Sequence, residues 1–134
     1  MTDREREIHF LVEAAKVARK FAHAKYSNYP VGAALQTEDG QVFVGSNVES
    51  SSYGLSVCAE RVALFKALSE GADNFTRIAV FTKSNPPASP CGACRQLLMD
   101  YAPDIEILLA NERGEVVETS IDELLPNPFT DNDL

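Results

Sequence analysis

The chain has 134 residues, 45% of them hydrophobic, which is enough for the core of one domain covering residues 1–134. Its formal net charge of −8 disfavours nucleic acid as a partner, because phosphate recognition normally requires an excess of Lys and Arg. We expect no membrane partner and a cytoplasmic location, because the chain has no apolar run of about 18 residues and its charged start lacks the apolar segment of a secretory signal.

The first half of the chain predicts a helix, a hairpin and a second helix. Apolar residues recur every three or four positions over 5–25, which is typical of an amphipathic helix. Residues 31–37 and 42–47 are expected as strands, joined at Asp39-Gly40, a strong hairpin-turn signal. A serine-rich loop at 49–57 leads to a helix from Cys58 to about Gly71, where glycine suits the C-terminal cap.

The second half predicts a strand, a helix and two further strands. A buried strand at 77–82 and a proline-rich loop at 83–90 precede a helix from Cys91 to about Tyr101. Strands follow at 105–110 and 115–118, and Ser120 with Glu123 has the spacing of a capping box. Helices that alternate with apolar strands indicate an α/β domain, with a central sheet and helices on its faces.

All three cysteines lie at the predicted starts of two helices, in Cys58-Ala59-Glu60 and in Pro90-Cys91-Gly92-Ala93-Cys94. A helix N-terminus favours the thiolate, which is the form that binds metal. Three thiolates leave the fourth position of tetrahedral zinc for water, as in catalytic zinc sites. Glu60 is close enough to share the cavity without ligating, which suits a general acid and base. An odd cysteine count with this spacing also fits a reducing compartment.

Two other interpretations of the cysteines remain open at this point. Cys91-Gly-Ala-Cys94 alone could be a redox motif at a helix start, although a third cysteine and Glu60 disfavour it. A structural zinc site in a protein that is not an enzyme would need a fourth protein ligand. His9 and His23 are the only histidines, and both fall in the first predicted helix, away from the motifs.

The joint pattern resembles the cytidine deaminase family. Cys-Ala-Glu followed by Pro-Cys-x-x-Cys is the signature of zinc-dependent nucleoside and base deaminases. The resemblance extends over nearly the whole chain, and its further segments are 26–35 (YSNYPVGAAL), 47–49 (NVE), 58–63 (CAERVA), 89–96 (SPCGACRQ) and 123–126 (ELLP). It implies a three-layer α/β/α sandwich with a central mixed five-stranded sheet.

The resemblance also implies an activity. We expect hydrolytic deamination of cytidine and 2′-deoxycytidine to uridine and 2′-deoxyuridine, with release of ammonia, as in pyrimidine salvage. One Zn²⁺ per chain, held by Cys58, Cys91 and Cys94, would activate the water, and Glu60 would move the protons. The alternative is a related deaminase that acts on a cytosine-containing antibiotic such as blasticidin S.

Further site residues follow from the same resemblance. The family binds the nucleoside through residues that match Tyr29, Asn47, Glu49, Ser51, Tyr53, Ala59 and Phe129. Tyr29 stands where relatives carry phenylalanine, and the family stacks the counterpart of Phe129 on the base in a neighbouring subunit. A homotetramer with shared sites is therefore expected.

Two arginines flank the cysteines. Zinc with three thiolates carries a net charge of −1, and a guanidinium bonded to a sulfur would restore the acidity of the bound water. The resemblance gives Arg61 this role and suggests it for Arg95, although both could also be solvated helix residues.

Overall fold

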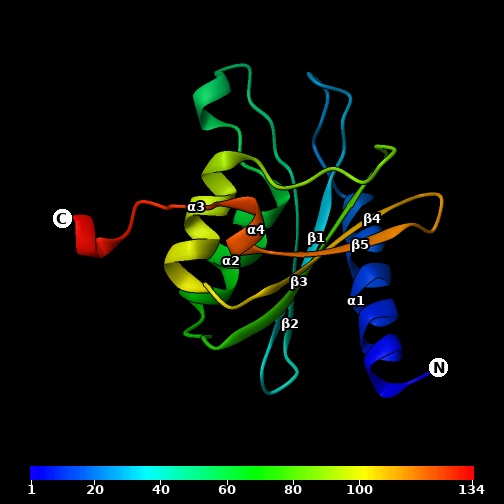
Figure 1. Ribbon diagram of the computed structural model, residues 1–134. Helices are drawn as coiled ribbons and strands as arrows, with labels where there is room; N and C mark the ends of the chain where they lie inside the picture. The colour runs from blue at the N-terminus through cyan, green and yellow to red at the C-terminus, as the bar shows by residue number, and fades with distance from the viewer.

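The computed structural model describes all 134 residues, and five strands form one mixed sheet with helices on both faces (Figure 1). The strand order is β2-β1-β3-β4-β5, and only β3 and β4 run parallel. The strands are β1 (Gly32–Thr37), β2 (Val42–Ser46), β3 (Phe75–Thr82), β4 (Glu106–Asn111) and β5 (Val116–Ser120). The helices are α1 (Asp3–Arg19), α2 (Ala59–Ser69), α3 (Gly92–Tyr101) and α4 (Ile121–Leu124), with 3₁₀ turns at Tyr53–Leu55 and Asp131–Asp133. This confirms the expected three-layer sandwich.

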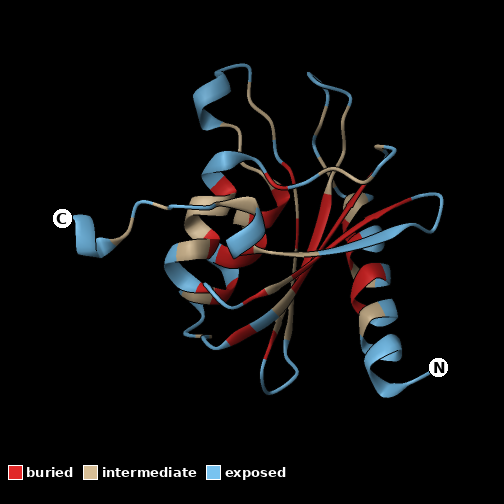
Figure 2. Cartoon of the chain, in the orientation of Figure 1, coloured by how far each residue is buried: buried red, intermediate tan, exposed pale blue.

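Each face of the sheet carries its own apolar core. Side chains alternate along a strand, so Ile78 and Val80 of β3 pack under α2 and α3, whereas Ala79 and Phe81 face α1. Most of the residues under α1 are small, which lets that helix lie close to the sheet. In Figure 2 the buried residues follow the central strands β1, β3 and β4 and the inner sides of the helices. No helix combines the length and apolarity needed to cross a membrane.

The first helix is shorter than its sequence pattern predicts. It begins at Asp3, because Thr2 and Glu5 form a reciprocal capping box, and it ends at Arg19 instead of reaching residue 25. The segment after the helix forms a β-bridge with residues near Val48. The His23 N–H donates to the Asn47 carbonyl at 2.9 Å, and the Glu49 N–H donates to the His23 carbonyl at 2.9 Å. These contacts with a distant segment stop a helix that local propensity would have continued.

The other boundaries shift by only a few residues. The strand expected from residue 77 already starts at Phe75, where it pairs with Thr37, and the last strand runs to Ser120. The predicted capping box of α4 is half formed. Ser120 Oγ accepts from the Glu123 N–H at 3.3 Å, but the Glu123 carboxylate accepts from the Thr119 hydroxyl at 3.1 Å instead of capping back.

Close packing of α2 on β2 positions the first cysteine segment. A Cβ built at Gly45 would lie 2.6 Å from the Ala63 nitrogen and 2.7 Å from the Ala59 oxygen, so only glycine allows this approach. Helix α3 connects the parallel strands β3 and β4 on the same face of the sheet. The N-termini of α2 and α3 therefore meet at one edge of the sheet, where ligand sites of α/β proteins lie.

Candidate metal centre and active site

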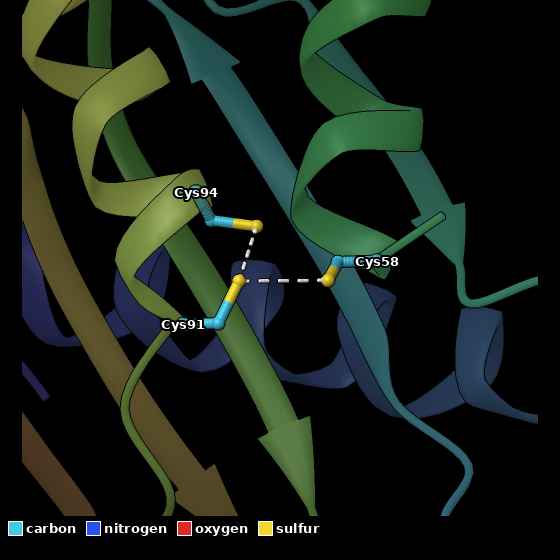
Figure 3. A group of neighbouring side chains, drawn as sticks. All are labelled: Cys58, Cys91 and Cys94. Carbon is cyan, nitrogen blue, oxygen red and sulfur yellow. Dashed lines mark hydrogen bonds between the residues drawn. The ribbon is translucent and has the colours of Figure 1, made fainter. Parts of the chain in front are cut away.

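The three cysteines converge where α2 and α3 begin (Figure 3). Cys58 and Cys91 are the N-cap residues of the two helices, and Cys94 lies in the first turn of α3. The Cys58 and Cys91 sulfurs are 3.7 Å apart, those of Cys91 and Cys94 are 3.5 Å apart, and all three lie within 4.8 Å of one another. The sulfurs form no disulfide, so all three remain available as ligands.

This arrangement of sulfurs fits zinc. Zinc–sulfur bonds of about 2.3 Å in a tetrahedron put neighbouring sulfurs about 3.8 Å apart, close to the two shorter separations. The group of candidate ligands contains these three cysteines and neither histidine. Three protein ligands leave one position open, which is the pattern of a catalytic site and not of a closed structural one.

The groups around Cys58 favour its thiolate form, which is the form that binds metal. Hydrogen bonding with Cys94, helped by the guanidinium of Arg61, lowers the pKa of Cys58 to about 5 despite partial burial. Arg61 Nη2 donates to Cys58 Sγ at 3.3 Å. Hydrogen bonding with Cys58 and burial together raise the pKa of Cys94. Zinc binds the thiolate form, so metal binding releases the protons that these thiols carry.

Glu60 lies in the first turn of α2, two residues after the Cys58 ligand candidate, and is only 6% exposed. Burial raises the pKa of Glu60 to about 7, and the negative charge on Cys58 adds to the rise. A carboxyl group that titrates near neutral pH can both take up and return a proton, which is the requirement for a general acid and base.

One cavity of about 370 Å³ connects Glu60 and the metal ligands, a volume within the range of small-molecule sites. Two of the cysteines and Glu60 contribute to its wall, together with four of the residues expected to bind a nucleoside. The lining residues are Ser27, Tyr29, Val31, Asn47, Glu49, Cys58, Ala59, Glu60, Val80, Thr82, Ala88, Ser89 and Cys91.

Asn47 and Glu49 brace one wall of this cavity. Asn47 Oδ1 accepts from the Val31 N–H at 2.8 Å, and its Nδ2 donates to the Tyr29 carbonyl at 3.0 Å. Glu49 accepts from the Ser27 hydroxyl and from the backbone N–H groups of residues 26 and 27. The Ser27 hydroxyl and these N–H groups lower the pKa of Glu49. Both side chains therefore hold the loop that presents Tyr29.

Three of the expected nucleoside-binding residues lie outside the cavity of their own chain. Ser51 is exposed on the serine-rich loop, and Tyr53 is 81% exposed in the 3₁₀ turn that follows. Phe129 is 58% exposed in the C-terminal tail, where its carbonyl accepts from Gln96 Nε2 at 2.8 Å. The cavity of a single chain is therefore lined by four of the seven expected nucleoside-binding residues.

The two arginines behave differently. Arg61 donates to a cysteine sulfur, whereas Arg95 donates to three other acceptors. Arg95 donates instead to the Pro90 carbonyl at 2.8 Å, to the Leu124 carbonyl at 2.7 Å and to Ser89 Oγ at 2.8 Å. It ties α4 to the loop that leads into Cys91, and so acts on the cysteine through the backbone.

Sequence reasoning did not single out several wall residues, among them Val80, Thr82 and Ala88. Val80 and Thr82 lie near the C-terminal end of β3, the central strand that α2 and α3 cover on one face. The signal that could have identified them is their position at the end of a buried strand just before the Cys91 segment.

Comparison with known proteins gives the same family by sequence and by structure. The sequence model of the cytidine and deoxycytidylate deaminase zinc-binding region matches residues 4–108. A cytidine deaminase from Halalkalibacterium halodurans is 46% identical over 125 residues, covering 92% of this chain and 95% of its own length. The crystal structure of cytidine deaminase from Burkholderia pseudomallei is 51% identical, with a TM-score of 0.88 over 96% of this chain and 100% of that one.

A second activity is represented among the relatives. A blasticidin-S deaminase from Bacillus cereus is 35% identical over 114 residues, which cover 79% of this chain and 81% of the relative. It is therefore more distant than the two cytidine deaminases in both identity and coverage. With a family match over most of its length and relatives well above 30% identity, the chain belongs to the cytidine and deoxycytidylate deaminase family.

Proposed function

We propose that this protein is a zinc-dependent cytidine deaminase, which hydrolyses cytidine and 2′-deoxycytidine to uridine and 2′-deoxyuridine in pyrimidine salvage. The observation that carries the proposal is a group of three free cysteine sulfurs within 4.8 Å of one another, two of whose residues line the same cavity as the buried Glu60. Zinc on these sulfurs supplies Lewis acidity that makes a water molecule nucleophilic near neutral pH.

Glu60 performs the proton transfers in this reaction. Its carboxylate accepts a proton from the attacking water and gives it to N3 of the cytosine, which makes C4 electron-poor. It then passes the second water proton to the departing amino group, so that water and cytidine yield uridine and ammonia. A pKa near 7 makes both directions of transfer accessible.

The remaining wall of the cavity holds the nucleoside. Tyr29 offers an aromatic surface, while Asn47 and Glu49 lie where an amide and a carboxylate could meet the sugar hydroxyls. Ala59 opens α2, where the first N–H groups lack acceptors within the helix. None of the 13 lining residues is Lys or Arg, so the cavity suits an uncharged nucleoside better than a nucleotide with its phosphate.

The direct test is the fall in absorbance as cytidine becomes uridine, measured with and without a chelator. We expect turnover that disappears when the chelator removes the metal and returns when zinc is added. Parallel assays with 2′-deoxycytidine and blasticidin S compare kcat/KM for the two substrate classes. A higher kcat/KM for blasticidin S, or full turnover without metal, would contradict the proposal.

We also propose a homotetramer in which active sites are shared between subunits. The support is that Tyr53 and Phe129 are strongly exposed and do not line the cavity of their own chain. Large apolar side chains in an otherwise polar tail are unfavourable in water unless a partner covers them. A cytoplasmic location is proposed as well, because three unpaired thiols fit a reducing compartment.

Replacing Phe129 with alanine is expected to raise KM for cytidine without loss of zinc. Stacking of an aromatic side chain on a base contributes about 1–3 kcal/mol, which corresponds to a KM increase of roughly 5- to 150-fold. The matched control is Phe10→Ala, because Phe10 is 60% exposed but lies on α1, and its KM should not change.

Mixed oligomers test whether Phe129 acts on a neighbouring site. Subunits with Glu60→Gln are combined with subunits with Phe129→Ala, so that some sites receive both defects and others neither. We expect activity above the average of the two parents. An active monomer in light scattering, or activity equal to that average, would rule out shared sites.

A further inference from the structure

Two loops that contribute residues to the wall of the cavity are linked to each other by side chains. The first loop, residues 26–30, carries Tyr29, and the second, residues 83–90, leads from β3 to Cys91. The Tyr29 hydroxyl is hydrogen-bonded to Ser84 Oγ in a partly buried position. Beside this bond, Lys83 Nζ donates to the Asn28 carbonyl at 2.9 Å and lies 5.6 Å from the centre of the Tyr29 ring.

Ser84 is itself held from the interior of the protein. Asn111, which is 3% exposed at the end of β4, donates from Nδ2 to the Ser84 carbonyl at 3.0 Å. Its Oδ1 accepts from the N–H groups of Arg113 at 3.0 Å and Glu115 at 3.2 Å. Because the buried side chain of Asn111 makes all three hydrogen bonds, it is held rigidly. It fixes the backbone of Ser84 in turn, so the Ser84 hydroxyl is a fixed partner for the Tyr29 hydroxyl.

From this geometry we infer that the Tyr29–Ser84 hydrogen bond is a tether that positions the nucleoside-facing wall of the cavity. The inference rests on the proposed function and adds to it. The Tyr29 ring lines the cavity, but its hydroxyl is engaged by another part of the protein. Tyr29 is thus a positioning residue. Its hydroxyl does not contact the sugar, so Tyr29 does not distinguish ribose from deoxyribose.

Kinetics with both nucleosides distinguish a tether from a direct sugar contact. Tyr29→Phe and Ser84→Ala are each expected to raise KM by about three- to tenfold, the effect of losing one net hydrogen bond. The factor should be the same for cytidine and 2′-deoxycytidine, and kcat should change less than KM because Glu60 and the cysteines are untouched. The double variant should resemble either single one, because both changes remove the same bond.

The control is Tyr101→Phe, which removes the hydroxyl of an exposed tyrosine that makes no side-chain hydrogen bond. Its KM should equal that of the unmodified chain. A Tyr29→Phe effect confined to cytidine would mean that the hydroxyl contacts the 2′-hydroxyl group, and would overturn the tether. Additive effects in the double variant, or an unchanged KM in Ser84→Ala, would overturn it as well.

Hydrogen exchange gives a readout that does not depend on turnover. Loss of the tether should speed exchange of the backbone amides in residues 83–90 in both Tyr29→Phe and Ser84→Ala, but not in Tyr101→Phe. Unchanged exchange in both variants would refute the tether. If the unmodified chain turned over neither nucleoside while exchange still increased, the proposed function would fail and the tether would stand.

Discussion

Glu60→Gln is expected to lower kcat by at least about 100-fold while zinc remains bound at one per chain. The amide is nearly the same shape as the carboxyl group but cannot accept and return a proton. Several steps of the reaction pass through this one group, so the loss should exceed that of a residue with a single role. Steady-state kinetics and metal analysis of the same preparation measure the two effects together.

The fold should tolerate this substitution. Burial raises the pKa of Glu60, so the ionised carboxylate opposes folding as the pH rises, and a neutral amide removes that cost. The melting temperature of the variant should therefore not fall below that of the unmodified chain. Glu70→Gln, an exposed change at the C-cap of the same helix, is the matched control and should keep full activity. A Glu60→Gln variant with more than about a tenth of the original turnover would exclude the proposed role.

Cys91→Ala and Cys94→Ala are each expected to abolish both metal binding and activity. Two remaining thiolates are too few to hold a zinc site, because the metal affinity comes from the complete ligand set. The loss should appear as zinc content near zero in metal analysis and as kcat/KM below detection.

The pair of variants contains its own control, because Cys91 is exposed and Cys94 is 1% exposed. If the cysteines served only packing, the exposed one could be replaced without effect and only Cys94→Ala would matter. Equal loss of zinc in both variants therefore points to ligation, and circular dichroism checks that each remains folded. One tightly bound zinc per chain in either variant would refute the ligand set.

Two of the three candidate metal ligands are brought together by local spacing. Cys91 and Cys94 are the N-cap and a first-turn residue of α3, so any helix that starts at this point brings their sulfurs together. The position of Cys58, 33 residues earlier than Cys91, has no such local basis. It depends on β1 lying between β2 and β3, which brings α2 and α3 to the same face of the sheet.

The two arginines also show the difference between contacts set by local spacing and contacts set by tertiary packing. Arg61 and Arg95 both follow a cysteine within one helical turn, and their sequence surroundings suggested the same contact to sulfur. Only Arg61 makes it, because the donors of Arg95 bond to the Leu124 carbonyl at the end of α4 and to the Ser89-Pro90 loop. These acceptors belong to segments whose approach could not be inferred from the spacing around Arg95.

Apolar periodicity, the Asp-Gly turn and the cysteine spacing were thus enough to predict the α/β class, the order of the main elements and a group of three cysteines that could hold a metal ion. The tertiary structure decided where α1 ends, which acceptor Arg95 uses and what the Tyr29 hydroxyl does. The physical reason is that backbone geometry restricts contacts within one helical turn or hairpin, whereas contacts between distant segments depend on how the whole chain packs.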